Sequence, residues 1–284
     1  MTIKRPIVAC FAALLVIAAV SAILPGPLEA IPIDVSLDPK KFGTLDQAKT
    51  NCPNLNCGPA AAVNSFVYLQ NMFPGTYKVP LVPAGKEIDV ANALNGKNFM
   101  NTCCVEGGGT SIADFILGEM AYMEQQNTAA TRYKAQMSDE WSAPGHPGVK
   151  KPTFVQDNTK PTVAFIADEL KAGEDVELAL KPFTGPGHYV TLTGITFNTE
   201  TGTGTISFVD PMGGMVGKAG IKRGPGENVS IMTDYMIGDQ VTRVVGAVAE
   251  SPVPEPTTLL LFGTTAAGLG FARWRQRRRK QPQR

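Results

Sequence analysis

Histidine is nearly absent from this sequence: among 284 residues, only His146 and His188 can supply an imidazole. The chain also lacks internal repeats and long low-complexity runs. Its glycine clusters at 107–109 and 213–214 have no phosphate-loop context, so we interpret them as turns. Cysteine is limited to five residues, one of them near the N-terminus. Chemistry that needs a nucleophile and an imidazole base therefore has few candidates.

The N-terminal end has the composition of a targeting segment. Lys4 and Arg5 precede an apolar run over residues 7–24, which small residues and Pro25-Gly26-Pro27 follow. A positive start, an apolar run and a small-residue exit are the parts of a secretory signal peptide. We therefore expect a signal peptide over residues 1–30. The alternative is an uncleaved membrane anchor, against which the alanine-rich run and its proline-containing end argue.

The C-terminal end has three parts in order: Pro254-Glu255-Pro256, an apolar stretch over residues 257–272, and an arginine-rich tail over residues 273–280. The apolar stretch is marginal for crossing a bilayer as a transmembrane helix. This order resembles the PEP-CTERM sorting signal of Gram-negative bacteria that make exopolysaccharide, and we place that signal over residues 251–284. The resemblance implies processing by an exosortase, a destination at the cell surface or in the extracellular matrix, exopolysaccharide as a candidate partner, and only transient contact with the membrane. A simple tail anchor is the alternative.

The charge of the remaining chain argues against some partners. Residues 31–250, which we expect to form the mature domain, contain 17 basic and 23 acidic residues, a net charge of −6. An acidic domain without a basic stripe argues against nucleic acid as a partner.

Periodicity predicts the order of the secondary structure. Apolar residues at helical spacing predict helices over residues 57–71, 87–94, 112–126 and 161–171. Alternating or β-branched runs predict strands over residues 176–180, 189–197, 203–209, 230–235 and 240–248. Residues 31–50 are expected to be an extended lead-in, and residues 133–149 to be irregular. Helices followed by strands predict an α+β domain rather than an alternating α/β domain.

Cys57 lies where a loop becomes a helix. Asn56, Gly58 and Pro59 are typical of a helix start, and three alanines follow. The positive end of the helix dipole stabilises a thiolate, and the free N–H groups of a first turn stabilise an oxyanion. Cys57 is therefore a candidate nucleophile.

Two further residues fit the same chemistry. His188 opens a predicted strand after a Gly-Pro-Gly turn, and Asp210 ends the next strand. If these strands pair as a hairpin, His188 and Asp210 become neighbours. The carboxylate can then orient the imidazole and stabilise its cation, while the imidazole activates Cys57.

With these residues the sequence resembles the papain-like cysteine peptidases, and among them the bacteriocin-leader-processing group that cuts after double-glycine leaders. The shared motifs, in order, are Cys57-Gly58-Pro59-Ala60, Gly187-His188 and Asp210-Pro211. The resemblance implies a papain-like α+β fold with N-terminal helices packed on an antiparallel sheet, and peptide-bond hydrolysis by Cys57, His188 and Asp210. The family also carries a glutamine six residues before its cysteine as an oxyanion donor. That position is Asn51 here, so either Asn51 or Gln47 would have to donate.

Several alternatives stay open at this point. Cys57 could instead form a disulfide with Cys52, Cys103 or Cys104; if Cys57 is free, Cys52 could pair with Cys103 or Cys104. Adjacent cysteines at 103 and 104 are poor ligand spacing, and we expect neither a metal nor a cofactor. We expect His146, between two prolines, in an exposed turn. A non-catalytic matrix or adhesion domain is the alternative function, and an amidase or transamidase would use the same three residues as a peptidase.

Overall fold

The computed structural model describes residues 32–103, 108–126, 131–224 and 230–253. The predicted signal peptide, Cys104 and the predicted membrane helix over residues 257–272 lie outside the described residues. Within those ranges, no helix is both long and apolar enough to cross a membrane.

Strands dominate the part of the chain that the structure describes. The nine strands are β1 (Ile33–Ser36), β2 (Thr131–Met137), β3 (Val155–Gln156), β4 (Asp175–Pro182), β5 (His188–Asn198), β6 (Thr203–Asp210), β7 (Met215–Arg223), β8 (Ile231–Ile237) and β9 (Gln240–Pro252). Every pairing is antiparallel except that of β2 with β3.

Six of these strands close into an antiparallel barrel. Each strand from β4 to β8 pairs with the next in sequence, and β9 then pairs with β4, from Asp175 opposite Glu250 to Pro182 opposite Thr242. The remaining strands extend the barrel at two places: β1 pairs with the second half of β5, and β2, followed by β3, pairs with the second half of β9.

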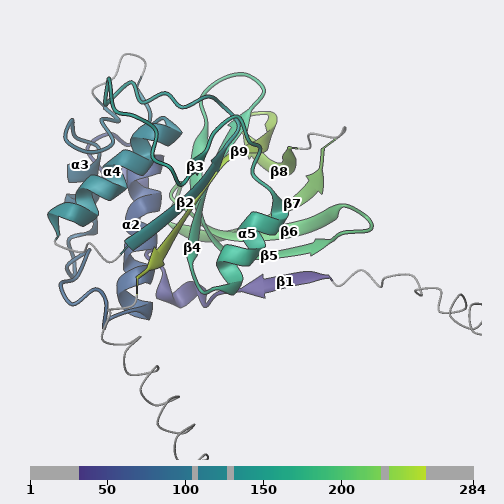
Figure 1. Cartoon of the computed structure of the whole chain (residues 1–284), viewed down its shortest axis with the longest axis horizontal. Coiled ribbons are helices and arrows are strands. Elements are labelled where there is room, and N and C mark those ends of the chain that lie inside the picture. The colour runs from purple at the N-terminus through teal and green to yellow at the C-terminus, as the bar shows by residue number, and fades with distance from the viewer. Residues whose placement is uncertain (1–31, 104–107, 127–130, 225–229, 254–284) are drawn as a thin grey trace, which may run out of the picture. The chain divides into compact units, whose positions relative to one another are not determined.

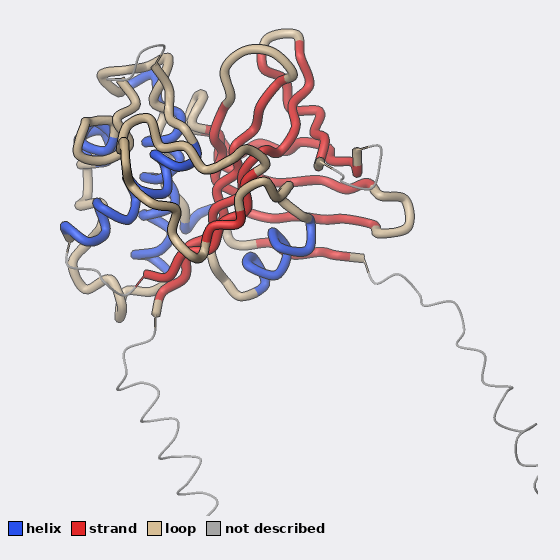
Figure 2. Tube along the Cα trace, turned by 45° about the horizontal axis from the view of Figure 1, so that its top comes forward, coloured by secondary structure: helices blue, strands red, loops and turns tan. Residues whose placement is uncertain are grey.

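Four α-helices are present in the described ranges. They are α2 (Cys57–Met72), α3 (Glu87–Leu94), α4 (Ile112–Gln125) and α5 (Val163–Lys171), with short 3₁₀ turns η1 (Pro39–Lys41) and η2 (Gln47–Lys49). The side chains of Ser111 and Thr162 cap α4 and α5 by accepting a hydrogen bond from a first-turn N–H. Helices α2, α3 and α4 lie together beside the strands, whereas α5 lies apart from them, over β1, β4 and β5 (Figures 1 and 2).

Alternation along the strands divides the buried apolar residues into two clusters. In β4, Val176, Leu178 and Leu180 belong to the cluster that fills the barrel and contacts α5. On the opposite face of the same strands, residues such as Ala179 and Tyr189 pack with α2 and α4. One sheet therefore supports two cores, and its outer face positions the N-terminus of α2.

The papain-like α+β prediction is wrong. The protein is mostly β, with a closed six-stranded antiparallel barrel and four short helices in the described ranges. The sequence analysis missed β7, which pairs with both β6 and β8 and is needed for closure. Met215 and Val216 at the start of β7 are exposed and two of its residues are glycines, so the strand lacks a clear apolar alternation.

Candidate active site around Cys57 and His188

Cys57 is the first residue of α2, and its side chain is buried with 9% of its surface exposed. It is a free thiol in the described part of the chain. The next residue has to be small, because a Cβ on Gly58 would lie 3.0 Å from Oγ1 of Thr110. This close approach brings the loop before α4 against the helix start.

His188 is the first residue of β5, where it pairs with Leu180 of β4. The turn before it needs glycine for two reasons: Gly185 has a φ of +101°, and a Cβ on Gly187 would lie 2.9 Å from the carbonyl oxygen of Leu180. The ring of His188 is almost fully buried, with 4% of the side chain exposed.

The hairpin of β5 and β6 brings His188 and Asp210 together, as the sequence analysis expected from strand pairing. Nε2 of His188 lies 2.7 Å from Oδ1 of Asp210. The same oxygen accepts a hydrogen bond from the backbone N–H of Met212, at 2.8 Å. The imidazole and this N–H thus both hold the carboxylate at the end of β6.

Tyr235 of β8 also belongs to this arrangement, and the sequence analysis missed it as a site residue. Its hydroxyl donates to Oδ2 of Asp210 at 2.7 Å, and its ring stacks on His188 with an interplanar angle of 8°. A tyrosine at the edge of a predicted strand carries no signal of such a role. Only the closure of the barrel brings β8 beside this end of β5.

The electrostatics of the pair favour a charged imidazole. Burial lowers the pKa of His188, but the hydrogen bonds to Asp210 and Cys57 and the charges of these two residues raise it by more than burial lowers it. The net effect is to raise the pKa of His188 from 6.5 to about 9. Burial acts to raise the pKa of Asp210, yet the hydrogen bond and charge of His188, followed by the bond from Tyr235, hold it below its usual value. Because Asp210 occupies Nε2, Nδ1 is the nitrogen left for Cys57.

The two expected oxyanion donors are engaged elsewhere. Nε2 of Gln47 donates to the carbonyl oxygen of Pro53 at 2.8 Å, although the backbone N–H of Gln47 reaches the carbonyl oxygen of Pro211, next to Asp210. Oδ1 of the exposed Asn51 accepts a hydrogen bond from Asn95. Neither amide is placed at Cys57 by a described contact.

A cavity of about 520 Å³ is lined by both Cys57 and His188. Gly109 and Thr110 line it from the loop before α4, and Asp139 and Lys181 are among its charged residues. The cavity is large enough for several residues of an extended chain, and the thiol and the imidazole both border it.

Two other cysteines and the second histidine lie outside the lining of this cavity and have described partners. Cys52 and Cys103 form a disulfide, so the pairing that was left open is Cys52 with Cys103. His146 lies in a turn, as expected, but it is half-buried rather than exposed: its Nδ1 lies 3.0 Å from Oδ1 of the buried Asp114.

Comparison with known proteins identifies the C-terminal end. Residues 252–279 match the PEP-CTERM protein-sorting motif. No curated protein matches the chain. The motif supports the predicted sorting signal and implies processing by an exosortase; the chain is exported through the inner membrane and sorted to the cell surface or the extracellular space.

Proposed function

We propose that this exported protein is a cysteine peptidase in which Cys57 is the nucleophile, His188 the general base and acid, and Asp210 the orienting residue. The observation that carries the proposal is the position of His188 between a free thiol and a half-buried carboxylate, at the wall of a cavity. A pKa of about 9 keeps the imidazole protonated beside Cys57 at neutral pH, and a protonated imidazole is the partner that a thiolate nucleophile requires.

The proposed reaction has two halves. The thiolate of Cys57 attacks the substrate carbonyl carbon, and the negative charge moves to the carbonyl oxygen, next to the N–H groups of the first turn of α2. Nδ1 of His188 gives its proton to the departing amine as the C–N bond breaks, which leaves a thioester on Cys57. Neutral His188 then takes a proton from water, the hydroxide displaces the thiolate, and the acid product is released.

Asp210 and Tyr235 act on this reaction through the ring of His188. The carboxylate holds Nε2, and the stacked phenol restricts rotation of the imidazole. A fixed ring keeps Nδ1 directed at Cys57 through both proton transfers. Tyr235 is a positioning residue in this proposal.

A second candidate function is a non-catalytic matrix or adhesion domain. The observation in its favour is that both expected oxyanion donors bond elsewhere: the side-chain amide of Gln47 donates to Pro53, and that of Asn51 accepts from Asn95. Loss of a side-chain oxyanion donor costs on the order of 100-fold or more in rate, so the proposed enzyme depends on backbone N–H groups alone. An amidase or transamidase would differ only in the substrate and the acceptor.

The deciding experiment measures two properties of the exported protein: its covalent reaction with a peptide-based electrophile, and its hydrolysis of a peptide library. We expect both with the wild type, neither with Cys57→Ala, and strong loss with His188→Ala. His146→Ala is the matched control, because this second histidine does not border the cavity, and it should retain both. Peptide hydrolysis by Cys57→Ala, or an inert thiol in the folded wild type, would refute the enzyme and leave the matrix domain.

A further inference from the structure

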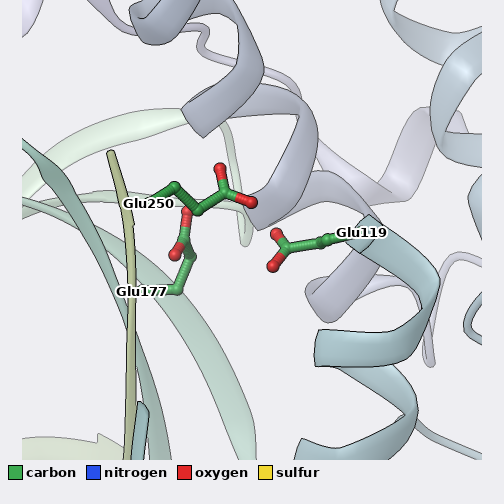
Figure 3. A group of neighbouring side chains, drawn as sticks. All are labelled: Glu119, Glu177 and Glu250. Atoms are coloured by element: carbon green, nitrogen blue, oxygen red, sulfur yellow. The ribbon is translucent and has the colours of Figure 1, made fainter. Parts of the chain in front are cut away.

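Three glutamates from separate elements converge inside the protein, away from Cys57. They are Glu119 of α4, Glu177 of β4 and Glu250 of β9, and their carboxylates point toward one another (Figure 3). One oxygen from each lies within 4.8 Å of the other two. No more than 1% of any of the three residues is exposed.

The strands place a fourth carboxylate beside them. Asp175 of β4 is directly opposite Glu250 of β9 and is fully buried. Like charges opposite each other in a sheet destabilise it, and buried carboxylates are expensive unless they are paired. A sheet that keeps these residues inside a core therefore needs something to compensate their charge.

Hydrogen bonding compensates the cluster only in part. Both oxygens of Glu119 and both oxygens of Glu177 have no hydrogen-bond partner among the described residues. The hydroxyl of Ser65, from α2, donates toward Oε2 of Glu250 at 3.2 Å and contacts Asp175. Glu119 provides evidence that is independent of the two strands, because it comes from α4. Its fully buried, unsatisfied carboxylate points toward Glu177 and Glu250 (Figure 3).

Carboxyl and hydroxyl groups of the described residues surround the cluster. Burial, and then the charges of Glu250, Glu177 and Asp175, raise the pKa of Glu119; burial followed by neighbouring carboxylates likewise raises the pKa values of Glu177 and Glu250. Glu174 adds a further acidic group beside Asp175. The uncharged groups that interact with these acids are Ser65 and Tyr68 of α2, Tyr77 of the following loop, Tyr133 of β2 and Tyr189 of β5. The acids can therefore be neutralised by retained protons or by a bound cation.

We propose that Glu119, Glu177 and Glu250 bind a hard divalent cation, with Ca²⁺ as the best fit, between α4 and the barrel. An all-oxygen donor set is the one that Ca²⁺, Mg²⁺ and Mn²⁺ prefer. Opposite ligands of Ca²⁺ lie about 4.6–5.2 Å apart, from bond lengths of about 2.3–2.6 Å, and the separations of up to 4.8 Å between the glutamate oxygens are compatible with that range. Such an ion would join the helix layer to the sheet, and this proposal is independent of the peptidase proposal.

The test measures metal content and thermal stability of the purified full chain. Elemental analysis should find about one divalent ion per chain, and removal with EDTA should lower the melting temperature. Adding back Ca²⁺ at about 100 times its dissociation constant should raise the melting temperature by at least about 5 °C. Tb³⁺, a luminescent substitute for Ca²⁺, should gain tyrosine-sensitised emission, because Tyr133 contacts the cluster.

The variant that tests the ligands is Glu119→Gln, which keeps the shape of the side chain and removes its charge. It should lose most of the stabilisation by the added ion, whereas Glu124→Gln, an exposed position on the same helix, should keep it. A larger stabilisation by Mg²⁺ or Mn²⁺ than by Ca²⁺ would support the site and overturn Ca²⁺ as its ion. The site would be overturned if the purified wild type contains no metal and neither its melting temperature nor its Tb³⁺ emission responds to any of these ions. Retained protons would then be what neutralises the glutamates.

Discussion

The hydroxyl of Tyr235 donates a 2.7 Å hydrogen bond to the oxygen of Asp210 that His188 does not use. The carboxylate is thus held from both sides, by a residue of β8 and by a residue of β5. Since β8 and β5 are separated by two strands around the barrel, this contact exists only because the sheet closes.

The first prediction concerns this hydroxyl. Tyr235→Phe keeps the ring that stacks on His188 and removes the hydrogen bond to a charged group, so unfolding by denaturant should cost about 1.5 kcal/mol less. A freer carboxylate orients the imidazole less well, and the rate of thiol labelling should fall while the wild-type fold is retained. Tyr235→Leu, which also removes the stacking, should lower both quantities further. Equal stability and labelling of wild type and Tyr235→Phe would contradict the role of the hydroxyl.

The second prediction is a pH dependence of stability. The pKa of His188 is raised from 6.5 to about 9, so its contribution to stability is fully present below pH 6.5 and is lost as the pH rises through about 9. In Asp210→Asn the charge and the best acceptor are removed, and this loss between pH 6.5 and 9 should become smaller. Urea denaturation at pH 6, 7.5 and 9 measures it. Asp34→Asn, an exposed position on β1, should keep the wild-type dependence.

The third prediction concerns the backbone turn before His188. In Gly187→Ala the new methyl group would lie 2.9 Å from the carbonyl oxygen of Leu180, so β4 and β5 have to separate. The cost should be about 1–3 kcal/mol in the free energy of unfolding, with slower labelling of Cys57 because His188 moves with the strand. Gly75→Ala, where no atom lies within 4 Å of the added carbon, is the control and should change neither quantity appreciably.

The fourth prediction concerns the disulfide of Cys52 and Cys103, which are 51 residues apart. Closing a loop of that length restricts the unfolded chain, and replacing both cysteines by serine should lower the free energy of unfolding by about 4 kcal/mol. Calorimetry on the oxidised wild type and the double variant measures the difference. Under oxidising conditions a thiol count of the unfolded wild type should still detect Cys57. A blocked Cys57 in that count would contradict both the pairing and the proposed nucleophile.

The individual elements were easier to predict than their assembly. The start of α2 at Cys57 and the hairpin of β5 and β6 depend on local signals, namely a Gly-Pro helix start and alternating runs joined by glycines, and these predictions were confirmed. The strand β2 was wrongly expected to be irregular. This strand forms by pairing with β9, whose residues lie more than a hundred positions later in the sequence. No local pattern predicts such a pairing.

The same distinction applies to the candidate site. His188 and Asp210 could be placed together because hairpin geometry relates the start of one strand to the end of the next. Tyr235 and the glutamate cluster could not, because they converge only through barrel closure and through packing of α4 on the strands. The glutamine role was predicted from family resemblance alone, and the hydrogen bond from Gln47 to Pro53 assigns its amide elsewhere.

Strand β9 has a mechanical consequence for a protein that is sorted by its C-terminal end. The matched motif begins at residue 252, which is also the last residue of β9, so tension on that end is transmitted directly into the strand. Ladder hydrogen bonds run across an antiparallel strand, so a pull along β9 loads its bonds to β4 and β2 together, in shear, instead of opening them one at a time. A force on the C-terminal end would therefore meet a strand that resists it with both of its ladders at once.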